Sequence, residues 1–372
     1  MEAVRRHVAR RPMPAAVVAD VSWVNGLAAV RSLARAGAPV VAVDHRRGAL
    51  GFRSRHALGV LCPDPVRDPD GYVEFLVGLA DALGRPAPIF PTHDEHLNAI
   101  ARGADRLEGR FLFPFPAWDV LAPIQRKRHQ LQAAREAGIP IPRTVDEPTD
   151  ELDYPVLVKP SDPVGFRRAF GRQSFRCASR PELDEAFGRA RPHDPLVQEL
   201  VPGGDDALYS LGSYVAADGE ALGLFSGRKL RQTPPGVGTC RVGEAVWVDE
   251  VVEQGLALLR ALEFHGLSQV EFKRDPRDGV FKLMEVNPRL WQWHGLAAAC
   301  GVDLPRIAYW DLLGARLPAA RTNGSRKRWA ITLVAGSRPA LVRPPYVDAI
   351  FSGSDPGPAL AQAARLVRGR AR

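Results

Sequence analysis

Two glutamates and an asparagine in the last third of the chain have the types and spacing of a metal-binding face. Glu271 and Glu285 lie in two strand-like segments, 269–274 and 280–287, separated by the turn-forming sequence DPRDG. If the turn makes the segments antiparallel, the two glutamates lie nearly opposite each other, and Asn287 shares the face of Glu285. Mg²⁺ takes one or two carboxylates and completes its octahedron with water and phosphate oxygens, so these ligands suit it.

The same hairpin also fits an interpretation without a metal. The two carboxylates would then be solvated and balanced by nearby cations, which are Lys273, Lys282 and Arg289. Like charges placed opposite each other repel, so both interpretations put positive charge close to the pair. The hairpin alone leaves the two interpretations equally supported.

Two lysines and a glutamate precede the hairpin. Lys127 lies in a basic helix, Lys159 closes the apolar strand VLVKP, and Glu199 ends the strand of PLVQELV. Ammonium groups offset phosphate charge, a metal bridges phosphates, and Gly-bearing loops close over a nucleotide. The sequence lacks both GxxxxGK[ST] and a kinase-type HRD and DFG pair, so neither common phosphoryl-transfer fold explains these residues.

The elements that must position these side chains begin with a predicted α/β region. Residues 15–44 are typical of a βαβ unit, 71–84 of an amphipathic helix, and Thr92–Glu95 of a polar turn between a strand and a helix. Such alternation predicts a small parallel sheet with ligand space at the carboxyl ends of its strands. The first loop lacks GxGxxG. His93 and His96 resemble half a metal site, but a helix start with acidic residues is the favoured interpretation.

The second half is predicted to mix strands and loops. Residues 161–176 are expected to form a long loop, and Arg167, Arg168 and Arg172 are its candidate phosphate contacts. For each arginine, an exposed position without ligand is an equally supported interpretation.

The net charge of +8 is not spread over the molecule. Residues 1–12, 321–328 and 365–372 together carry +11, which leaves −3 for the rest of the chain. Solvated ends and a loop explain this pattern, so nucleic acid is not predicted as a partner. The four cysteines have no metal-ligand spacing, and no apolar run is long enough for a transmembrane helix. A cytoplasmic enzyme is expected.

Four motifs in this order resemble the ATP-grasp enzymes of the carboxylate–amine ligase type, such as carbamoyl phosphate synthetase large-chain domains and D-aspartate-ligase-like proteins. They are RKRHQLQAAREAGIPIP, YPVLVKP, LVQELVPG and VEFKRD…GVFKLMEVNPR. The resemblance covers about residues 15–315 and implies an α/β and α+β fold. A parallel, Rossmann-like (pre-ATP-grasp) domain would occupy 15–118 and a two-lobed ATP-grasp domain 119–318.

Within that second domain, the resemblance implies a small lobe at about 145–200 and a large lobe at about 201–318. Residues 1–14 would be a disordered basic extension, with Met13 as an alternative start. Residues 319–372 would be a C-terminal extension with a basic tail.

The resemblance also implies a role for each matching residue. ATP phosphates would contact Lys127 and Lys159, and the metal ligands would be Glu271, Glu285 and Asn287. Lys229 would approach the phosphates or an acyl phosphate, and Arg289 would bind the carboxylate or stabilise the tetrahedral intermediate; a salt bridge to Glu285 is the structural alternative for Arg289. The adenine edge would meet Glu199 and the backbone of Leu200 and Val201, and Asp206, or Asp205, would contact the ribose.

The implied activity is ATP-dependent ligation. ATP would activate a carboxylate as an acyl phosphate, and an amine would then form an amide. The cofactors would be ATP and Mg²⁺, with Mn²⁺ as a substitute, and the partners a small carboxylate and a small amine. The alternatives are an ATP-binding sensor without turnover and a bicarbonate-using, carboxylase-like enzyme. A homodimer is considered because dimers are the commonest assembly of soluble enzymes. The substrates are expected to be selected by Asp20–Asn25, Thr92–Glu95 and Trp291–His294.

Overall fold

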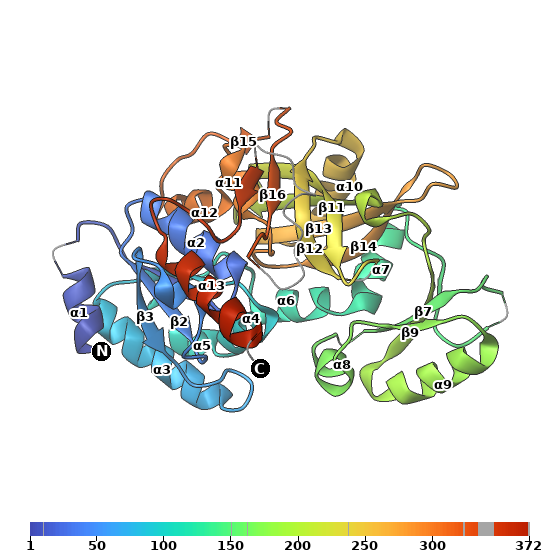
Figure 1. Ribbon diagram of the computed structural model, residues 1–372, viewed down its shortest axis with the longest axis horizontal. Helices are drawn as coiled ribbons and strands as arrows, with labels where there is room; N and C mark the ends of the chain where they lie inside the picture. Colours follow the sequence, from blue (N-terminus) through green and yellow to red (C-terminus); the bar gives the residue numbers. More distant parts are fainter. Residues whose placement is uncertain are drawn as a thin grey trace.

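The computed structural model describes residues 1–9, 11–149, 151–161, 163–236, 238–322, 324–333 and 346–370. The end of the predicted basic tail, residues 371–372, lies outside the described residues. Figure 1 shows three parts: a first domain on the left, a large lobe at the upper right, and a small lobe at the lower right. These parts correspond to the α/β and α+β fold class predicted from the sequence, which is confirmed.

The first domain is built on a five-stranded parallel sheet in the order β3-β2-β1-β4-β5. The three central strands β1, β2 and β4 are apolar and buried on both faces, as expected of a parallel sheet covered by helices, whereas the edge strand β3 is partly exposed. The strands are β1 (Ala16–Ala19), β2 (Val40–Asp44), β3 (Ala57–Leu61), β4 (Ala87–Pro91) and β5 (Phe111–Leu112). The helices are α2 (Val24–Arg35), α3 (Pro69–Leu83), α4 (Asp94–Arg102) and α5 (Ala104–Leu107).

The N-terminal segment differs from its prediction. Residues 1–14 were predicted to be disordered, but Glu2–Val8 forms a short helix, α1. Val4 of this helix is buried in the same hydrophobic cluster as Tyr72 and Leu76 of α3, and α1 packs against α3. Burial of this apolar side chain is the physical reason why the basic segment is ordered.

The small lobe is a four-stranded antiparallel sheet in the order β6-β9-β7-β8. Its elements are β6 (Thr144–Val145), β7 (Val156–Pro160), α8 (Pro163–Phe170), β8 (Phe175–Cys177), α9 (Arg180–Ala190) and β9 (Pro195–Glu199). The helix α8 lies where a long loop was predicted. Phe166 and Phe170, one turn apart on α8, pack their rings against Phe175, with ring centroids 5.1 Å apart in both pairs, and this contact stabilises the helix.

The large lobe is an eight-stranded sheet in the order β14-β13-β10-β11-β12-β16-β17, with β15 beside β11. Its main strands are β10 (Leu208–Val215), β11 (Ala221–Thr233), β12 (Thr239–Ala245), β13 (Gly266–Arg274) and β14 (Phe281–Asn287). Shorter strands are β15 (Ala320–Arg321), β16 (Arg328–Ala330) and β17 (Tyr346–Asp348). The helices of this half of the chain are α6 (Trp118–Ile124), α7 (Lys127–Glu136), α10 (Asp249–Ala261), α11 (Gly295–Ala299) and α12 (Leu304–Leu312).

The first domain and the large lobe share their hydrophobic cores. One cluster joins Val17 and Leu76 to Leu211 and Val270, and a second joins Leu27 of α2 to residues of α12 and to Trp291. The small lobe has its own cluster, formed by side chains such as Val158, Phe166 and Val197. The first domain and the large lobe therefore form one packed body, to which the small lobe is attached.

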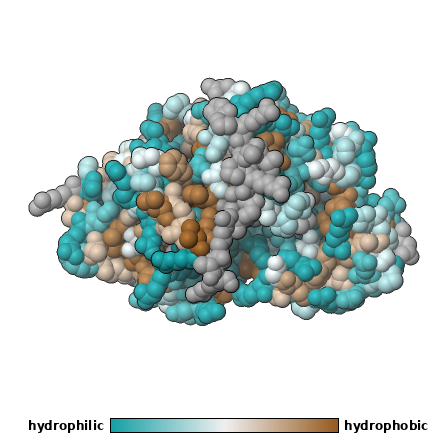
Figure 2. Space-filling model, viewed as in Figure 1, coloured by the Kyte–Doolittle hydropathy of each residue, from teal (hydrophilic) through white to brown (hydrophobic). Residues whose placement is uncertain are grey.

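The last described helix, α13 (Gly357–Arg370), returns to the first domain and packs against the short helix η1 (Leu50–Arg53) (Figure 1). Arg31 of α2 donates to the Asp355 carboxylate at 2.9 Å and to the Ile350 carbonyl at 2.8 Å. Figure 2 shows mostly hydrophilic residues on the face seen in this view, with smaller hydrophobic areas. Within the described residues, no helix is both long and apolar enough to cross a membrane.

Candidate functional site

A cavity of about 1410 Å³ lies where the three parts of the molecule meet. The large lobe lines it with the hairpin β13–β14, the small lobe with β7 and α8, and the first domain with the loops after β1 and β4. The three segments expected to select the substrates all contribute to its wall. Their lining residues are Asp20, Ser22, Trp23, Asn25, Thr92, His93, Asp94, Glu95, Trp291, Gln292 and Trp293.

The hairpin has the predicted register. Glu271 pairs with Glu285 across β13 and β14, and Gln269 pairs with Asn287. All four side chains line the cavity. The Asn287 amide donates to the Glu285 carboxylate at 3.0 Å, so the two side chains lie on one face, as the period of two requires.

Lysine side chains surround the two glutamates. Lys229 of β11 forms an ion pair with Glu271 at 2.7 Å, and both side chains are 9% exposed. Burial raises the pKa of Glu271, and the charge of Lys229 acts against this rise. Burial acts to raise the pKa of Glu285 as well, but the charge of Lys127 and the hydrogen bond from Asn287 hold it below its ordinary value. The face is therefore a site of concentrated negative charge balanced by lysines.

Lys127 and Lys159 reach this face from two different parts of the chain. Lys127 begins α7 and donates to the carbonyl of Met284, the neighbour of Glu285. Burial, with the charge of Lys159, lowers the pKa of Lys127 to about 7. Burial likewise lowers the pKa of Lys159, while Glu285 acts in the opposite direction. An anion bound between these two cations would offset their mutual repulsion.

The donor set fits Mg²⁺. Among the described residues, no group of three or more His, Cys, Asp and Glu side chains could hold a metal ion by itself. Glu271, Glu285 and Asn287 offer two carboxylates and one amide oxygen, which leaves positions for water and phosphate oxygens. These residues suit an ion that arrives together with a nucleotide.

Arg289 does not form the alternative salt bridge, to Glu285. Its guanidinium pairs with both oxygens of Asp94, the first residue of α4, with Nη2 3.2 Å from Oδ2. Burial acts to raise the pKa of Asp94, but Arg289 holds it well below its usual range. Arg289 Nη2 also lies 3.4 Å from Asn287 Oδ1. The first domain thus contacts the face of Glu285 and Asn287 through this ion pair.

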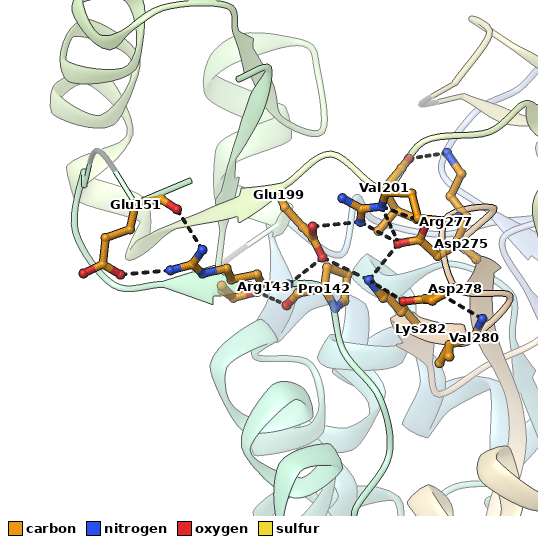
Figure 3. Close-up of polar contacts among 12 residues, drawn as sticks. Pro142, Arg143, Glu151, Glu199, Val201, Asp275, Arg277, Asp278, Val280 and Lys282 are labelled. Carbon is orange, nitrogen blue, oxygen red and sulfur yellow. Dashed lines mark hydrogen bonds and ion pairs between the residues drawn. The ribbon is translucent and has the colours of Figure 1, made fainter. Parts of the chain in front are cut away.

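Glu199 lies at the end of β9, where the small lobe joins the large lobe. Figure 3 shows its carboxylate between the small-lobe segment of Arg143 and the turn of the β13–β14 hairpin. It accepts hydrogen bonds from the Arg143 amide at 2.9 Å, from Arg277 at 2.9 Å and from Lys282 at 3.3 Å. This carboxylate connects the two lobes, whereas the following residues Leu200 and Val201 line the cavity. Their contact with adenine stays a prediction.

The two aspartates of the turn Asp205–Ala207 have different surroundings. Asp205 accepts hydrogen bonds from the backbone amides of Gln232 and Gly236, at 2.8 and 2.9 Å, and so anchors the loop between β11 and β12. Asp206 is exposed and does not line the cavity. The ribose contact of Asp206 also stays a prediction.

The loop after β1 has an unusual conformation. Asp20 has a φ of +67°, a left-handed conformation that costs a non-glycine residue of order 1 kcal/mol. The hydroxyl of Thr92 donates to the Asp20 carbonyl at 2.6 Å, and Asn25 donates to the Thr92 carbonyl at 2.7 Å. A Cβ on Gly26 would lie 2.4 Å from the Asp20 carbonyl, so the turn requires glycine there. These contacts fix the Asp20 carboxylate at the cavity wall.

Comparisons with known proteins identify similar sequences and similar folds. Residues 246–319 match the family described as the carbamoyl-phosphate synthase L chain, ATP binding domain. A D-aspartate ligase from Enterococcus faecium is 24% identical over 238 residues, which are 59% of this chain and 56% of that ligase. The chain therefore resembles ATP-grasp enzymes. It spans little more than half the length of that curated relative.

Solved structures show the same ATP-grasp fold at low sequence identity. The biotin carboxylase domain of a Hydrogenobacter thermophilus 2-oxoglutarate carboxylase, solved with magnesium ADP and bicarbonate, has a TM-score of 0.64 and 19% identity. The likeness covers 84% of this chain and 72% of that one. An L-amino acid ligase from Bacillus licheniformis has a TM-score of 0.59 and 14% identity, covering 80% of this chain and 74% of that one.

In the sequence analysis, Asp94 had no partner and Gln130 had no role. Asp94 was placed in a substrate loop without a partner, and only the fold brings it to Arg289. Gln130, three residues after Lys127, is buried and hydrogen-bonds both the amide and the carbonyl of Val286 on β14. The helical spacing of three from Lys127 to Gln130 was the available signal, because such residues share a face.

Proposed function

We propose that the protein is an ATP-dependent ligase that activates a carboxylate as an acyl phosphate and joins it to an amine. The observation that carries this proposal is the convergence of the paired Glu271 and Glu285 with Lys127, Lys159 and Lys229 in one cavity. The names of the E. faecium and B. licheniformis relatives, both ligases, support it. The family description supports ATP as the nucleotide.

The residues of the chain have separate tasks in the two steps. Lys127 and Lys159 would neutralise phosphate charge, and the small lobe, which has its own hydrophobic cluster, would close over the nucleotide and exclude water. Glu271, Glu285 and Asn287 would hold Mg²⁺, which supplies Lewis-acid polarisation of the transferred phosphoryl group when bound. Phosphoryl transfer needs positioning and charge neutralisation, and no protein nucleophile is required.

The second step forms the amide. Arg289, held by Asp94, would stabilise the oxyanion of the tetrahedral intermediate, and Lys229 would contact the acyl phosphate. The carboxylate and the amine would enter from the end of the cavity lined by Asp20, Thr92 and Trp291. Mn²⁺ as a substitute for Mg²⁺ and a homodimeric assembly remain predictions.

The test is phosphate release by the purified protein. With ATP, Mg²⁺ and a panel of carboxylic acids and amines, we expect release that requires both an acid and an amine. Glu285→Gln should lower the rate at least about 100-fold, because one ligand charge is lost from the site of phosphoryl transfer. Glu253→Gln, an exposed carboxylate on α10, is the matched control and should keep full activity. ATP binding without turnover on any pair would instead indicate a sensor.

A further inference from the structure

Amide formation from an amine needs a group that accepts a proton. An amine is mostly protonated near neutral pH, and its lone pair is available for attack only after a proton has left. Imidazole is the side chain best suited to accept that proton at this pH. Among the described residues that line the cavity, the one histidine is His93.

The fold does not explain why position 93 is a histidine. His93 is the N-cap of α4, a position that favours Ser, Thr, Asp or Asn, and its side chain makes no capping hydrogen bond. Its Nδ1 atom is buried and has no hydrogen-bond partner among the described residues. His96 and His294 also have one unpartnered ring nitrogen each, but the other nitrogen is hydrogen-bonded, to Tyr72 at 2.9 Å and to the Asn25 carbonyl at 3.0 Å. His93 is thus a polar side chain at the cavity wall without a structural task.

His93 adjoins a chain of contacts that leads to Asn287. The next residue, Asp94, holds Arg289, and Arg289 in turn contacts Asn287 of the metal-binding face. The His93 side chain is 34% exposed. Glu95 Oε2 lies 3.9 Å from His93 Nδ1.

Two carboxylates of the cavity are already engaged in ion pairs. Glu271 is paired with Lys229 and Asp94 with Arg289, so either would have to give up its partner to accept a proton. Lys127 donates to the Met284 carbonyl, and bound phosphate would keep its ammonium charged.

We propose that His93 is the general base that deprotonates the amine substrate; this inference rests on the ligase function proposed above. The imidazole takes a proton from the ammonium group, and the freed nitrogen lone pair forms the C–N bond to the acyl phosphate carbon. The C–O bond to phosphate then breaks, and its electron pair leaves with the phosphate. The second nitrogen proton is lost to the departing phosphate, so that one amide, one hydrogen phosphate and one imidazolium result.

Hydroxylamine as the amine distinguishes a general-base role of His93 from a role in maintaining the site. It is a weak base that is already neutral near pH 7, so it attacks an acyl phosphate without help from a base and yields a hydroxamate. In His93→Gln and His93→Ala, we expect amide formation with an ordinary alkyl amine to fall about 100-fold or more. Hydroxamate formation from the same acid, ATP and Mg²⁺ should stay within about twofold of the unaltered protein. His129→Gln, an exposed histidine on α7, is the matched control for both reactions.

Two outcomes would overturn the role of His93. Equal loss of hydroxamate and amide would show that His93 only maintains the site, and an unchanged rate of amide formation would show that it has no role. Hydroxamate formation in the unaltered protein also verifies the first half-reaction. If the unaltered protein forms no hydroxamate with any acid, the ligase function itself fails, and the inference fails with it.

Discussion

At the scale of single residues, the site is organised by pairs of opposite charge that join distant parts of the chain. Lys229 pairs with Glu271, and Arg289 pairs with Asp94. Each pair is largely removed from water, so loss of one partner leaves an uncompensated charge that costs several kcal/mol more than loss of an exposed pair. Mutation of either partner therefore affects the position of the other.

The Asp94–Arg289 pair can be tested by a double-mutant cycle. Asp94→Asn should lower kcat about 10- to 100-fold, because Arg289 loses the partner that orients it. In an Arg289→Met background, the same Asp94 change should have less than about a twofold effect. The measurement is kcat for the four proteins with one acid and one amine.

The control for this cycle is Asp303→Asn. Asp303 accepts a hydrogen bond from Ser32 and so also joins the first domain to the large lobe, but it does not line the cavity. This change should leave kcat unaltered. Equal effects of Asp94→Asn in both backgrounds would contradict a role exerted through Arg289.

Sequence alone could predict only part of the site at this scale. The opposition of Glu271 and Glu285 follows from period-two alternation across a short turn, and the structure confirms it. The partner of Arg289 lies 195 residues away in the chain, and no local pattern encodes a contact of that kind. The ligand roles of these residues stay predictions.

At the scale of elements, close packing beneath the site depends on a glycine. Gly212 of β10 lies against the ring of Trp291, and a Cβ there would stand 1.9 Å from a ring carbon. Trp291 is 2% exposed and lies two residues after Arg289. The strand therefore sets the position of the segment that carries the arginine.

Gly212→Ala should lower the free energy of unfolding by about 1–3 kcal/mol, because the indole and its segment must move to admit the methyl group. Chemical denaturation measures this change. Gly188→Ala is the matched control, since a Cβ at Gly188 of α9 meets nothing within 4 Å, and it should be neutral or slightly stabilising. Equal stabilities of the Gly212 variant and the unaltered protein would contradict the packing described.

The helix α8 shows why an element can be missed in the sequence. Its segment carries Pro163 and Gly165 at one end and Gly171 at the other, and these residues are typical of loops. The helical signal is the single apolar pair Phe166 and Phe170, which is too short a pattern to decide alone. Packing against Phe175 of the neighbouring strand supplies the stability that the local sequence lacks.

At the scale of the whole molecule, residues 346–370 pack against the first domain and attach the C-terminal part of the chain to it. Asp355 is fully buried and accepts hydrogen bonds from Arg31, Ser54 and the Arg55 amide at 2.8–3.0 Å. Burial acts to raise the pKa of Asp355, but these donors hold it below its ordinary value.

Asp355→Asn should lower the free energy of unfolding by about 2 kcal/mol at pH 7, because the charge that Arg31 and the backbone amide stabilise is lost. A carboxylate with a lowered folded pKa stabilises the fold above its unfolded pKa and loses this effect as pH falls. The difference from the unaltered protein should therefore shrink below about pH 4.

Denaturant unfolding at pH 7 and at pH 3.5 measures this dependence. Asp105→Asn, an exposed carboxylate on α5, is the control and should change stability little at either pH. A difference that grows on acidification would contradict the assigned cause.

The sequence could predict the fold at this scale because the order of motifs matched a known architecture. The boundaries of its parts stay predictions. The N-terminal helix was missed because its apolar signal is one valine pair, Val4 and Val8, which is too short a pattern to indicate a helix by itself.

The return of α13 to η1 also bears on how the chain acquires its structure. Residues 346–370 complete the cover of a domain whose first strand starts at Ala16, so the two ends of the described chain meet in one packed unit. Contacts across so great a sequence separation form late, since the entropy of closing the intervening loop must be overcome first. The strands of the first domain therefore reach their final packing only after α13, which is synthesised much later, has joined them.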